Sequence, residues 1–267
     1  MGGALGRSRP AAILWDLDGT LLDTSSSSFH ALADVLASLL REHAVAGAPP
    51  FEALLPVLSP GDEAVSLPPP SRDGKERADE DGVKQPAKHA WAKIALDMFH
   101  LSAHETPAGL VSKWESAMIK RRAVIPLLPG AIELVRHFKE LGVPQAIATM
   151  SSSASCAAKR RNNGELFGLV DALVCGDDRE VRHRKPHPDI FLVAASRLNV
   201  SAADCVVVED SVEGMRAGFA AGATVVGVPA AWVKDNLGNG VKANYLVTSL
   251  LNFPLAKLGL PPLPKVK

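Results

Sequence analysis

Cysteines are few in this chain of 267 residues, and aromatic side chains make up only 5% of it. Cys156, Cys175 and Cys205 are an odd set, without a Cys-x-x-Cys pair or the cysteine and histidine spacing of a zinc site. We therefore expect neither a disulfide framework nor a structural zinc ion. The expected location is a reducing compartment, the cytoplasm.

An excess of charge and a long hydrophobic run are also missing. Lysine and arginine number 29, as do aspartate and glutamate, so the formal net charge is zero. This balance favours neither nucleic acid nor an anionic membrane surface as a partner. The longest uncharged stretch, 217–233, is interrupted by glycines and Pro229, so we expect no transmembrane segment. The expected partner is a small molecule, and the expected assembly is a monomer or a weak dimer.

Short apolar runs alternate with amphipathic helical patterns along most of the chain. This alternation predicts an α/β fold, a Rossmann-like parallel sheet with helices on both faces. Strands are predicted at 12–16, 145–149, 172–175, 205–209 and 224–228, and helices at 131–141, 189–198 and 212–221.

The segment 25–122 differs, because it contains no convincing strand. Apolar residues at helical spacing near its two ends, over 32–39 and 110–118, predict amphipathic helices. We expect a helical cap at 25–122, inserted into a catalytic core formed by 1–24 and 123–267. Within the cap, 59–88 mixes three consecutive prolines with dense charge of both signs. That composition does not offset the entropy of ordering, so a disordered loop is predicted there.

Two aspartates, Asp16 and Asp18, follow the first predicted strand. Ligands bind at the carboxyl ends of the strands in open parallel sheets. At this spacing Asp16 can attack phosphorus while Asp18 gives a proton to the leaving oxygen and then activates water. Gly19 lets the chain turn sharply behind them. An Asp-Gly turn that closes a strand would explain 18–20 alone, but it does not explain a charged Asp16 at the end of an apolar run.

The fourth predicted strand also ends in carboxylates, Glu209 and Asp210. Carboxylates of Asp16 and Asp210 on neighbouring strands, with the carbonyl of Asp18 and water, would supply the hard oxygen ligands that Mg²⁺ prefers. Such a cation neutralises the phosphate so that a carboxylate can approach it. An alternative for Asp210 is to cap the following helix. The candidate metal ligands are Asp16, Asp18, Glu209 and Asp210.

Further polar groups are predicted to bind the phosphoryl oxygens. Thr149 ends the second strand with a hydroxyl, and Lys185 lies just before a helix on a backbone restricted by prolines. Taken alone, Thr149 could be an ordinary strand-ending threonine and Lys185 a solvated side chain. With the aspartates present, we count both as catalytic. The candidate phosphate-binding residues are Leu17, Gly19, Thr149, Met150, Ser151 and Lys185.

Other histidines and basic residues are interpreted as structural. His183 and His187 have no cysteine or acidic partner at zinc-ligand spacing, so surface or capping roles are favoured. The basic runs 120–122 and 159–161 are interpreted as solvated faces.

The catalytic candidates, in this order, resemble the haloacid dehalogenase superfamily. The resemblance rests on Asp-Leu-Asp-Gly-Thr at 16–20, then Thr149, Lys185, and Glu209 with Asp210. It implies that the first aspartate of 16–20 is the nucleophile and that the second is the general acid and base of phosphatases and mutases. Dehalogenases lack that second aspartate, so their chemistry is disfavoured.

Segments 176–181 and 185–192, and the tail segments 250–253 and 258–261, resemble the branch that holds pseudouridine-5'-phosphatase and glycerol-3-phosphatase. The match covers about 11–19 and 126–262. It implies a Mg²⁺-dependent phosphatase for a small sugar, polyol or nucleoside phosphate monoester. An alternative is a phosphosugar mutase similar to β-phosphoglucomutase, because the same core can pass phosphate to a sugar instead of water. A third hypothesis is a non-catalytic protein that binds phosphometabolites or a partner.

Overall fold

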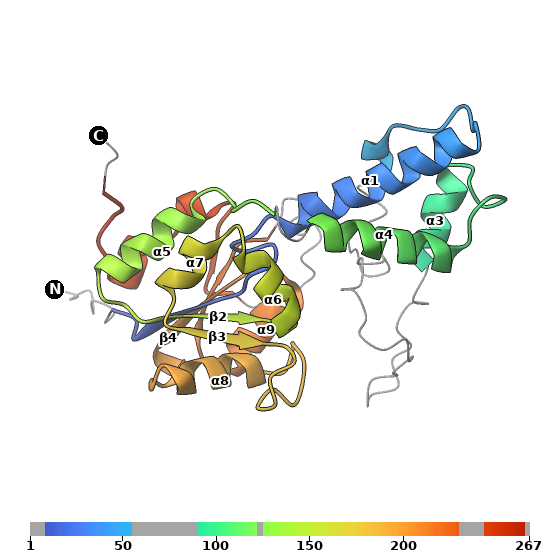
Figure 1. Cartoon of the computed structure of the whole chain (residues 1–267). Helices are drawn as coiled ribbons and strands as arrows, with labels where there is room; N and C mark the ends of the chain where they lie inside the picture. The colour runs from blue at the N-terminus through green and yellow to red at the C-terminus, as the bar shows by residue number, and fades with distance from the viewer. Residues whose placement is uncertain (1–8, 55–89, 122–124, 230–242, 265–267) are drawn as a thin grey trace. The chain divides into compact units, whose positions relative to one another are not determined.

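The computed structural model describes residues 9–54, 90–121, 125–229 and 243–264 (Figure 1). The chain divides into two compact units, which we call the core unit, Met1–Ser25 with Arg122–Lys267, and the helical unit, Ser26–Arg121. The loop predicted at 59–88 lies outside the described residues.

A six-stranded parallel sheet forms the centre of the core unit, in the order β3-β2-β1-β4-β5-β6. The predicted Rossmann-like α/β fold is thereby confirmed, as are all five predicted strands to within a residue. The sixth, β6, was not predicted, because two residues are too few to show a pattern. The strands are β1 (Ala12–Trp15), β2 (Gln145–Thr149), β3 (Ala172–Cys175), β4 (Cys205–Glu209), β5 (Thr224–Gly227) and β6 (Tyr245–Leu246).

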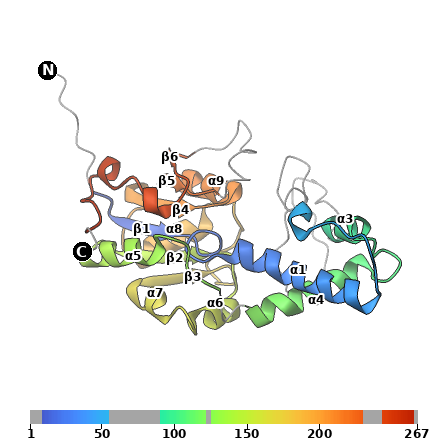
Figure 2. The same ribbon diagram turned by 90° about the horizontal axis from the view of Figure 1, so that it is seen from above.

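Helices cover both faces of the sheet, as Figures 1 and 2 show. Apolar side chains of β1 and β4 point alternately to the two sides: Trp15 and Val208 pack on the side of α5 and α7, and Leu14 and Val207 on the side of α8 and α9. Both strands are buried along their whole length, as expected for strands inside a parallel sheet. The helices are α5 (Ala131–Glu140), α6 (Ser153–Arg160), α7 (Gly164–Leu169), α8 (Asp189–Arg197) and α9 (Val212–Ala220).

The predicted helices α5, α8 and α9 are confirmed, whereas α6 and α7 were not predicted. These two have 8 and 6 residues. Helices this short show barely two turns of apolar spacing, and they are stabilised mainly by packing against the rest of the protein.

Aromatic packing anchors β1 just before the two aspartates. The Trp15 ring lies 5.8 Å from that of Phe138 and 6.2 Å from that of Phe253. Its indole nitrogen donates to Oε1 of Gln145 at 3.0 Å, and Gln145 donates in turn to the carbonyl of Val135 at 2.9 Å. Since a buried indole N–H needs a partner, this bond sets the orientation of Trp15.

The helical unit packs around its own apolar core and has no strand among its described residues. The indoles of Trp91 and Trp114 meet edge to face with centroids 5.6 Å apart. The two helices predicted near the ends of the segment are confirmed. The elements are α1 (Thr24–Glu42), the 3-10 turn η1 (Phe51–Leu54), α3 (Ala90–Met98) and α4 (Pro107–Arg121). Across the part of the chain that the structure describes, no helix combines the length and the apolar character needed to cross a membrane.

Candidate active site

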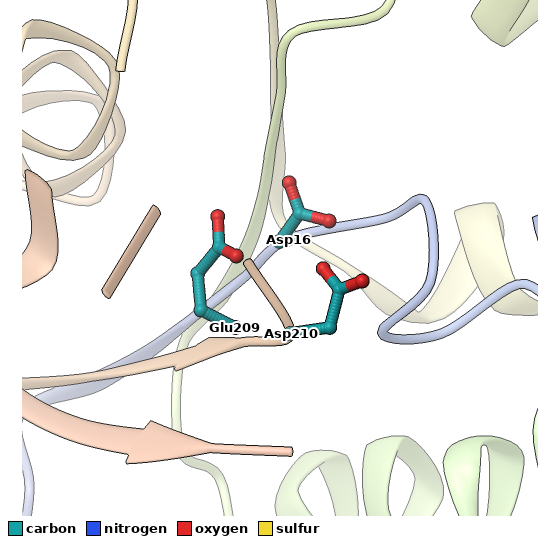
Figure 3. Close-up of side chains that lie close together, drawn as sticks. All are labelled: Asp16, Glu209 and Asp210. Carbon is teal, nitrogen blue, oxygen red and sulfur yellow. The ribbon is translucent and has the colours of Figure 1, made fainter. Parts of the chain in front are cut away.

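Three carboxylates converge at the carboxyl ends of β1 and β4 (Figure 3). Asp16 follows β1, Glu209 ends β4 and Asp210 comes next, and oxygens of the three lie within 4.8 Å of one another. The expectation that β1 and β4 are neighbours is confirmed, since Trp15 pairs with Val208. The amide of Asp16 donates to the carbonyl of Val208 at 2.9 Å, so the sheet itself brings these acids together.

Lys185 bridges two of the three carboxylates. Its Nζ donates to Oδ1 of Asp16 at 2.6 Å, to Oε1 of Glu209 at 2.5 Å and to the carbonyl of Ala148 at 3.3 Å. Its side chain is only 6% exposed. Burial alone would lower the pKa of Lys185, but the charges of Asp16 and Glu209 outweigh it and raise that pKa above its ordinary value. The lysine is therefore a fixed positive charge beside Asp16, and the solvated alternative is wrong.

The carboxylates carry more negative charge than Lys185 compensates. Burial raises the pKa of Asp16 to about 7 against the pull of Lys185, and the charges of Glu209 and Asp18 add to the rise. Burial also raises the pKa of Asp210 well above its ordinary value, and the charges of Glu209 and Asp16 raise it further. Three acids facing one ammonium thus create a site that favours an additional cation.

Glu209 is saturated by hydrogen bonds. Its Oε1 accepts from Lys185, while its Oε2 accepts from the amide of Ser211 at 3.0 Å and from the Ser211 hydroxyl at 2.9 Å. Gly214 leaves room for this carboxylate, because a Cβ there would lie 1.8 Å from its Cδ. Oxygens of Asp16 and Asp210 fit a hard cation such as Mg²⁺ better, and the carbonyl of Asp18 is a further oxygen of the same kind.

Asp210 does not cap the helix that follows it. Ser211 is the N-cap of α9, with its hydroxyl accepting from the amide of Gly214 at 3.0 Å. Asp210 instead approaches the turn after β1, where Thr20 donates to its Oδ1 at 3.4 Å. Gly19 has φ of +84°, and a Cβ there would lie 2.1 Å from Oδ2 of Asp210. The glycine is therefore required both by the turn and by the closeness of the carboxylate.

The Asp18 carboxylate is held by the segment that follows β2. Its Oδ2 accepts from the Ser151 hydroxyl at 2.6 Å and from the Thr149 hydroxyl at 3.4 Å, and its Oδ1 accepts from Lys159. The amide of Ser151 donates to the Thr149 hydroxyl at 3.1 Å. Both hydroxyls predicted to bind phosphate thus lie beside the predicted proton donor.

Two other phosphate-binding candidates have side chains directed elsewhere. Leu17 is fully buried in the apolar layer that also holds Trp15. Met150 packs against the apolar cluster on the opposite face of the sheet. Either residue can contribute to a phosphate site only through its backbone.

The solvated interpretation of the run 159–161 is wrong for its first residue. Lys159 is 4% exposed, whereas Arg160 and Arg161 are exposed. The sequence did contain a sign that Lys159 is buried. Ser155, Cys156 and Lys159 are at helical spacing, and they form the buried face of α6. This sign was missed because the segment was not predicted as a helix. His183 is exposed and contacts Asp189 at the start of α8, in line with the expected surface role, whereas α8 has no side-chain cap.

Comparison with known proteins agrees with this fold. A family model described as haloacid dehalogenase-like hydrolase matches residues 10–222. A crystal structure of a HAD family hydrolase from Deinococcus radiodurans R1, with bound phosphate and sodium, superposes with a TM-score of 0.64 at 27% identity. The superposition covers 94% of this chain and 97% of that one.

Among curated proteins, the chain is similar to phosphatases. It is 45% identical over 138 residues to the bifunctional riboflavin kinase/FMN phosphatase of Arabidopsis thaliana, covering 52% of this chain and 35% of that protein. It is 41% identical over 176 residues to a probable pseudouridine-5'-phosphatase of Drosophila melanogaster, covering 62% and 74%. It is 32% identical over 173 residues to the mitochondrial (DL)-glycerol-3-phosphatase 1 of Arabidopsis thaliana, covering 64% and 57%.

These matches confirm the resemblance to the branch that holds pseudouridine-5'-phosphatase and glycerol-3-phosphatase. The chain spans between about a third and three quarters of the length of these relatives. The family model covers most of the chain, and the parallel sheet agrees with it. The chain belongs to the haloacid dehalogenase-like hydrolase family.

Proposed function

We propose that the protein is a Mg²⁺-dependent phosphatase that hydrolyses a small phosphate monoester through an aspartyl-phosphate on Asp16. One observation carries the proposal: a buried Asp16 carboxylate lies 2.6 Å from the Lys185 ammonium and beside Asp210, with Asp18 two residues further along the turn. The relatives support a sugar, polyol or nucleoside phosphate as the substrate, since their names refer to glycerol 3-phosphate, FMN and pseudouridine 5'-phosphate.

Oxygens of Asp16, Asp210 and the Asp18 carbonyl would hold the Mg²⁺ ion. When bound, the ion supplies the positive charge that lets an anionic carboxylate approach an anionic phosphate. We assign Glu209 a different role, because its oxygens are engaged by Lys185 and Ser211. It orients the lysine and fixes its charge.

In the first step, an oxygen of Asp16 attacks phosphorus, and the bond between phosphorus and the leaving oxygen breaks. Asp18 transfers its proton to that oxygen, so that the product leaves as a neutral alcohol. Lys185 and the hydroxyl of Thr149, whose contact with Asp18 is long at 3.4 Å, bind the phosphoryl oxygens and stabilise the charge that is spread over them in the transition state. The product of this step is the phosphorylated Asp16.

In the second step, a water molecule attacks phosphorus while Asp18, now a carboxylate, takes one of its protons. The bond from phosphorus to Asp16 breaks, and inorganic phosphate leaves. Asp18 is again protonated and Asp16 is again a carboxylate, so the cycle closes. One residue thus serves as acid and then as base, which a carboxyl group beside the nucleophile can do without moving far.

We assign substrate selection to the helical unit. In this assignment residues 25–122 form a cap domain, and residues 1–24 and 123–267 form the catalytic core. The enzyme is expected to work in the cytoplasm as a monomer or a weak dimer. Three free thiols, all buried, support a reducing compartment.

The test is phosphate release from a panel of monoesters with and without Mg²⁺. The panel contains pseudouridine 5'-phosphate, FMN, glycerol 3-phosphate, hexitol phosphates and 4-nitrophenyl phosphate. We expect turnover with Mg²⁺, none after chelation, and none in Asp16→Asn, with the exposed Asp204→Asn as the matched control. Full turnover in Asp16→Asn would refute the mechanism. An isomerised phosphosugar without free phosphate would identify a mutase, and failure to cleave even 4-nitrophenyl phosphate would identify a non-catalytic binding protein.

A further inference from the structure

A buried lysine that the mechanism above does not use lies beside the proton donor. Lys159 Nζ donates to Oδ1 of Asp18 and, at 2.8 Å, to the hydroxyl of Ser151. Ser151 donates in turn to Oδ2 of Asp18 at 2.6 Å. These three groups close a triangle in which each oxygen of the carboxylate has its own donor and the two donors are bonded to each other.

The backbone that carries Lys159 is fixed at both ends. At the start of α6, the hydroxyl of Ser152 accepts from the amide of Ser155 at 3.2 Å. Just beyond its end, the buried side-chain amide of Asn163 donates to the backbone carbonyl of Lys159 at 3.1 Å and to that of Ile125 at 3.2 Å. In the middle, Cys156 Sγ lies 3.5 Å from Cys175 Sγ of β3. The ammonium is therefore placed by a rigid support, the condition for orienting another side chain.

The Asp18 carboxylate needs such support. Its side chain is 28% exposed and lies on a turn, and the last torsion of an aspartate is broad and has no steep minimum. With a hydrogen-bond donor on only one oxygen, the carboxylate could still rotate. A second donor on Oδ1 removes this freedom and fixes the direction in which Asp18 delivers its proton.

Direct binding of the phosphoryl group suits Lys159 less well. Lys185 already holds the nucleophile and is the ammonium nearest to it, at 2.6 Å from Asp16. The hydrogen bonds of Lys159 go to Asp18 and Ser151 instead. Two of the three N–H donors of this ammonium, which is 4% exposed, are engaged by those acceptors, so at most one is left for phosphate.

We propose that Lys159 is a positioning residue for proton transfer, which holds the Asp18 carboxyl group aimed at the leaving oxygen. This inference rests on the proposed function and adds to it a residue outside the strand ends. Its consequence is selective: loss of Lys159 impairs the cleavage of esters whose leaving oxygen needs a proton, and it spares esters whose leaving group departs readily as an anion.

The test is a leaving-group series with Lys159→Met. We expect kcat/KM for glycerol 3-phosphate, a poor leaving group, to fall about 100-fold, the scale on which a misplaced catalytic group acts. For 4-nitrophenyl phosphate we expect a loss of less than about 5-fold on the same grounds, and for phenyl phosphate an intermediate loss. Lys159→Gln keeps a hydrogen-bond donor on a shorter side chain. Its losses in kcat/KM should rank the three esters in the same order but be smaller. Arg160→Met, at the exposed neighbouring position, should leave all three values unchanged.

A double-mutant cycle separates positioning from other roles. In the Asp18→Asn background, where no proton can be delivered, Lys159→Met should change the single-turnover rate of phosphoryl transfer from phenyl phosphate by less than about twofold, because the two residues act as one unit. Equal losses across the leaving groups in both Lys159 variants, or an undiminished loss in the Asp18→Asn background, would overturn the inference alone. Absence of turnover by the unmodified protein would overturn the proposed function and this inference with it.

Discussion

Replacing Asp16 by asparagine should stabilise the metal-free protein at pH 8 while abolishing turnover. Asp16 is buried among like charges, and burial raises its pKa from 3.8 to about 7. The folded protein therefore holds this proton more tightly than the unfolded chain does. The free energy of unfolding must then fall as the pH rises from about 4 to about 7. Above pH 7 the folded protein carries the full cost of the buried charge.

The size of that cost follows from the pKa difference. A difference of about 3, at about 1.36 kcal/mol for each pKa unit, gives about 4 kcal/mol at pH 8. The pKa of about 7 already includes the attraction of Lys185 for the ionised carboxylate, so asparagine, which is neutral, should recover the whole of this cost. The net gain should be about 4 kcal/mol, or a rise in Tm of roughly 8–16 °C. At pH 5 the folded carboxyl group is neutral while that of the unfolded chain is already ionised, so the gain should fall to roughly 1.6 kcal/mol and disappear only below about pH 4.

The assay is denaturation by guanidinium chloride and by heat at pH 5 and pH 8, with a chelator present. Asp204→Asn, an exposed change of the same chemistry, should stay within about 0.5 kcal/mol of the unmodified protein. A less stable Asp16→Asn variant at pH 8, or an equal gain at both pH values, would refute the reasoning. Adding Mg²⁺ should raise the Tm of the unmodified protein more than that of the variant, since the variant lacks one carboxylate ligand.

Three further predictions concern the lysine, the turn and the core. Lys185→Met leaves two buried carboxylates without their cation, so the free energy of unfolding in guanidinium chloride should fall by about 3–5 kcal/mol. Unchanged stability would contradict the bridging role of Lys185. Gly19→Ala places a methyl group 2.1 Å from Oδ2 of Asp210 and should weaken Mg²⁺ binding in calorimetry, which an unaltered affinity would disprove. Phe138→Ala removes a ring 5.8 Å from that of Trp15 and should cost about 3–5 kcal/mol with activity retained in the folded fraction; a cost below 1 kcal/mol would show that the cluster repacks.

Strand positions were largely predictable from local pattern. Apolar runs at 12–16 and 205–209 are long enough, and end sharply enough in carboxylates, to show both the strand and its functional end. The adjacency of β1 and β4 also followed, because carboxylates at two strand ends are useful together only on neighbouring strands. Helices α6 and α7 were missed for the opposite reason, since their few turns are stabilised by tertiary packing.

Charged residues marked the site, but their pattern did not show how they divide its work. Glu209 and Asp210 are adjacent acids in the sequence, and both were candidates for the metal. In the fold, Glu209 is saturated by Lys185 and Ser211, whereas Asp210 turns toward the loop after β1. Successive side chains at a strand end point in opposite directions, so Glu209 and Asp210 reach different partners. Their order along the chain does not show which of them reaches the metal site.

The sequence by itself determined the fold class, the strands and the candidate residues at the strand ends, because apolar periodicity and residue chemistry are local properties. Only the tertiary structure decided that Lys159, 141 residues from Asp18, turns inward to hold it while Arg160 beside it faces water. The reason is physical. A charged side chain is buried only where a distant part of the chain supplies its partner, and that pairing exists only once the chain has folded.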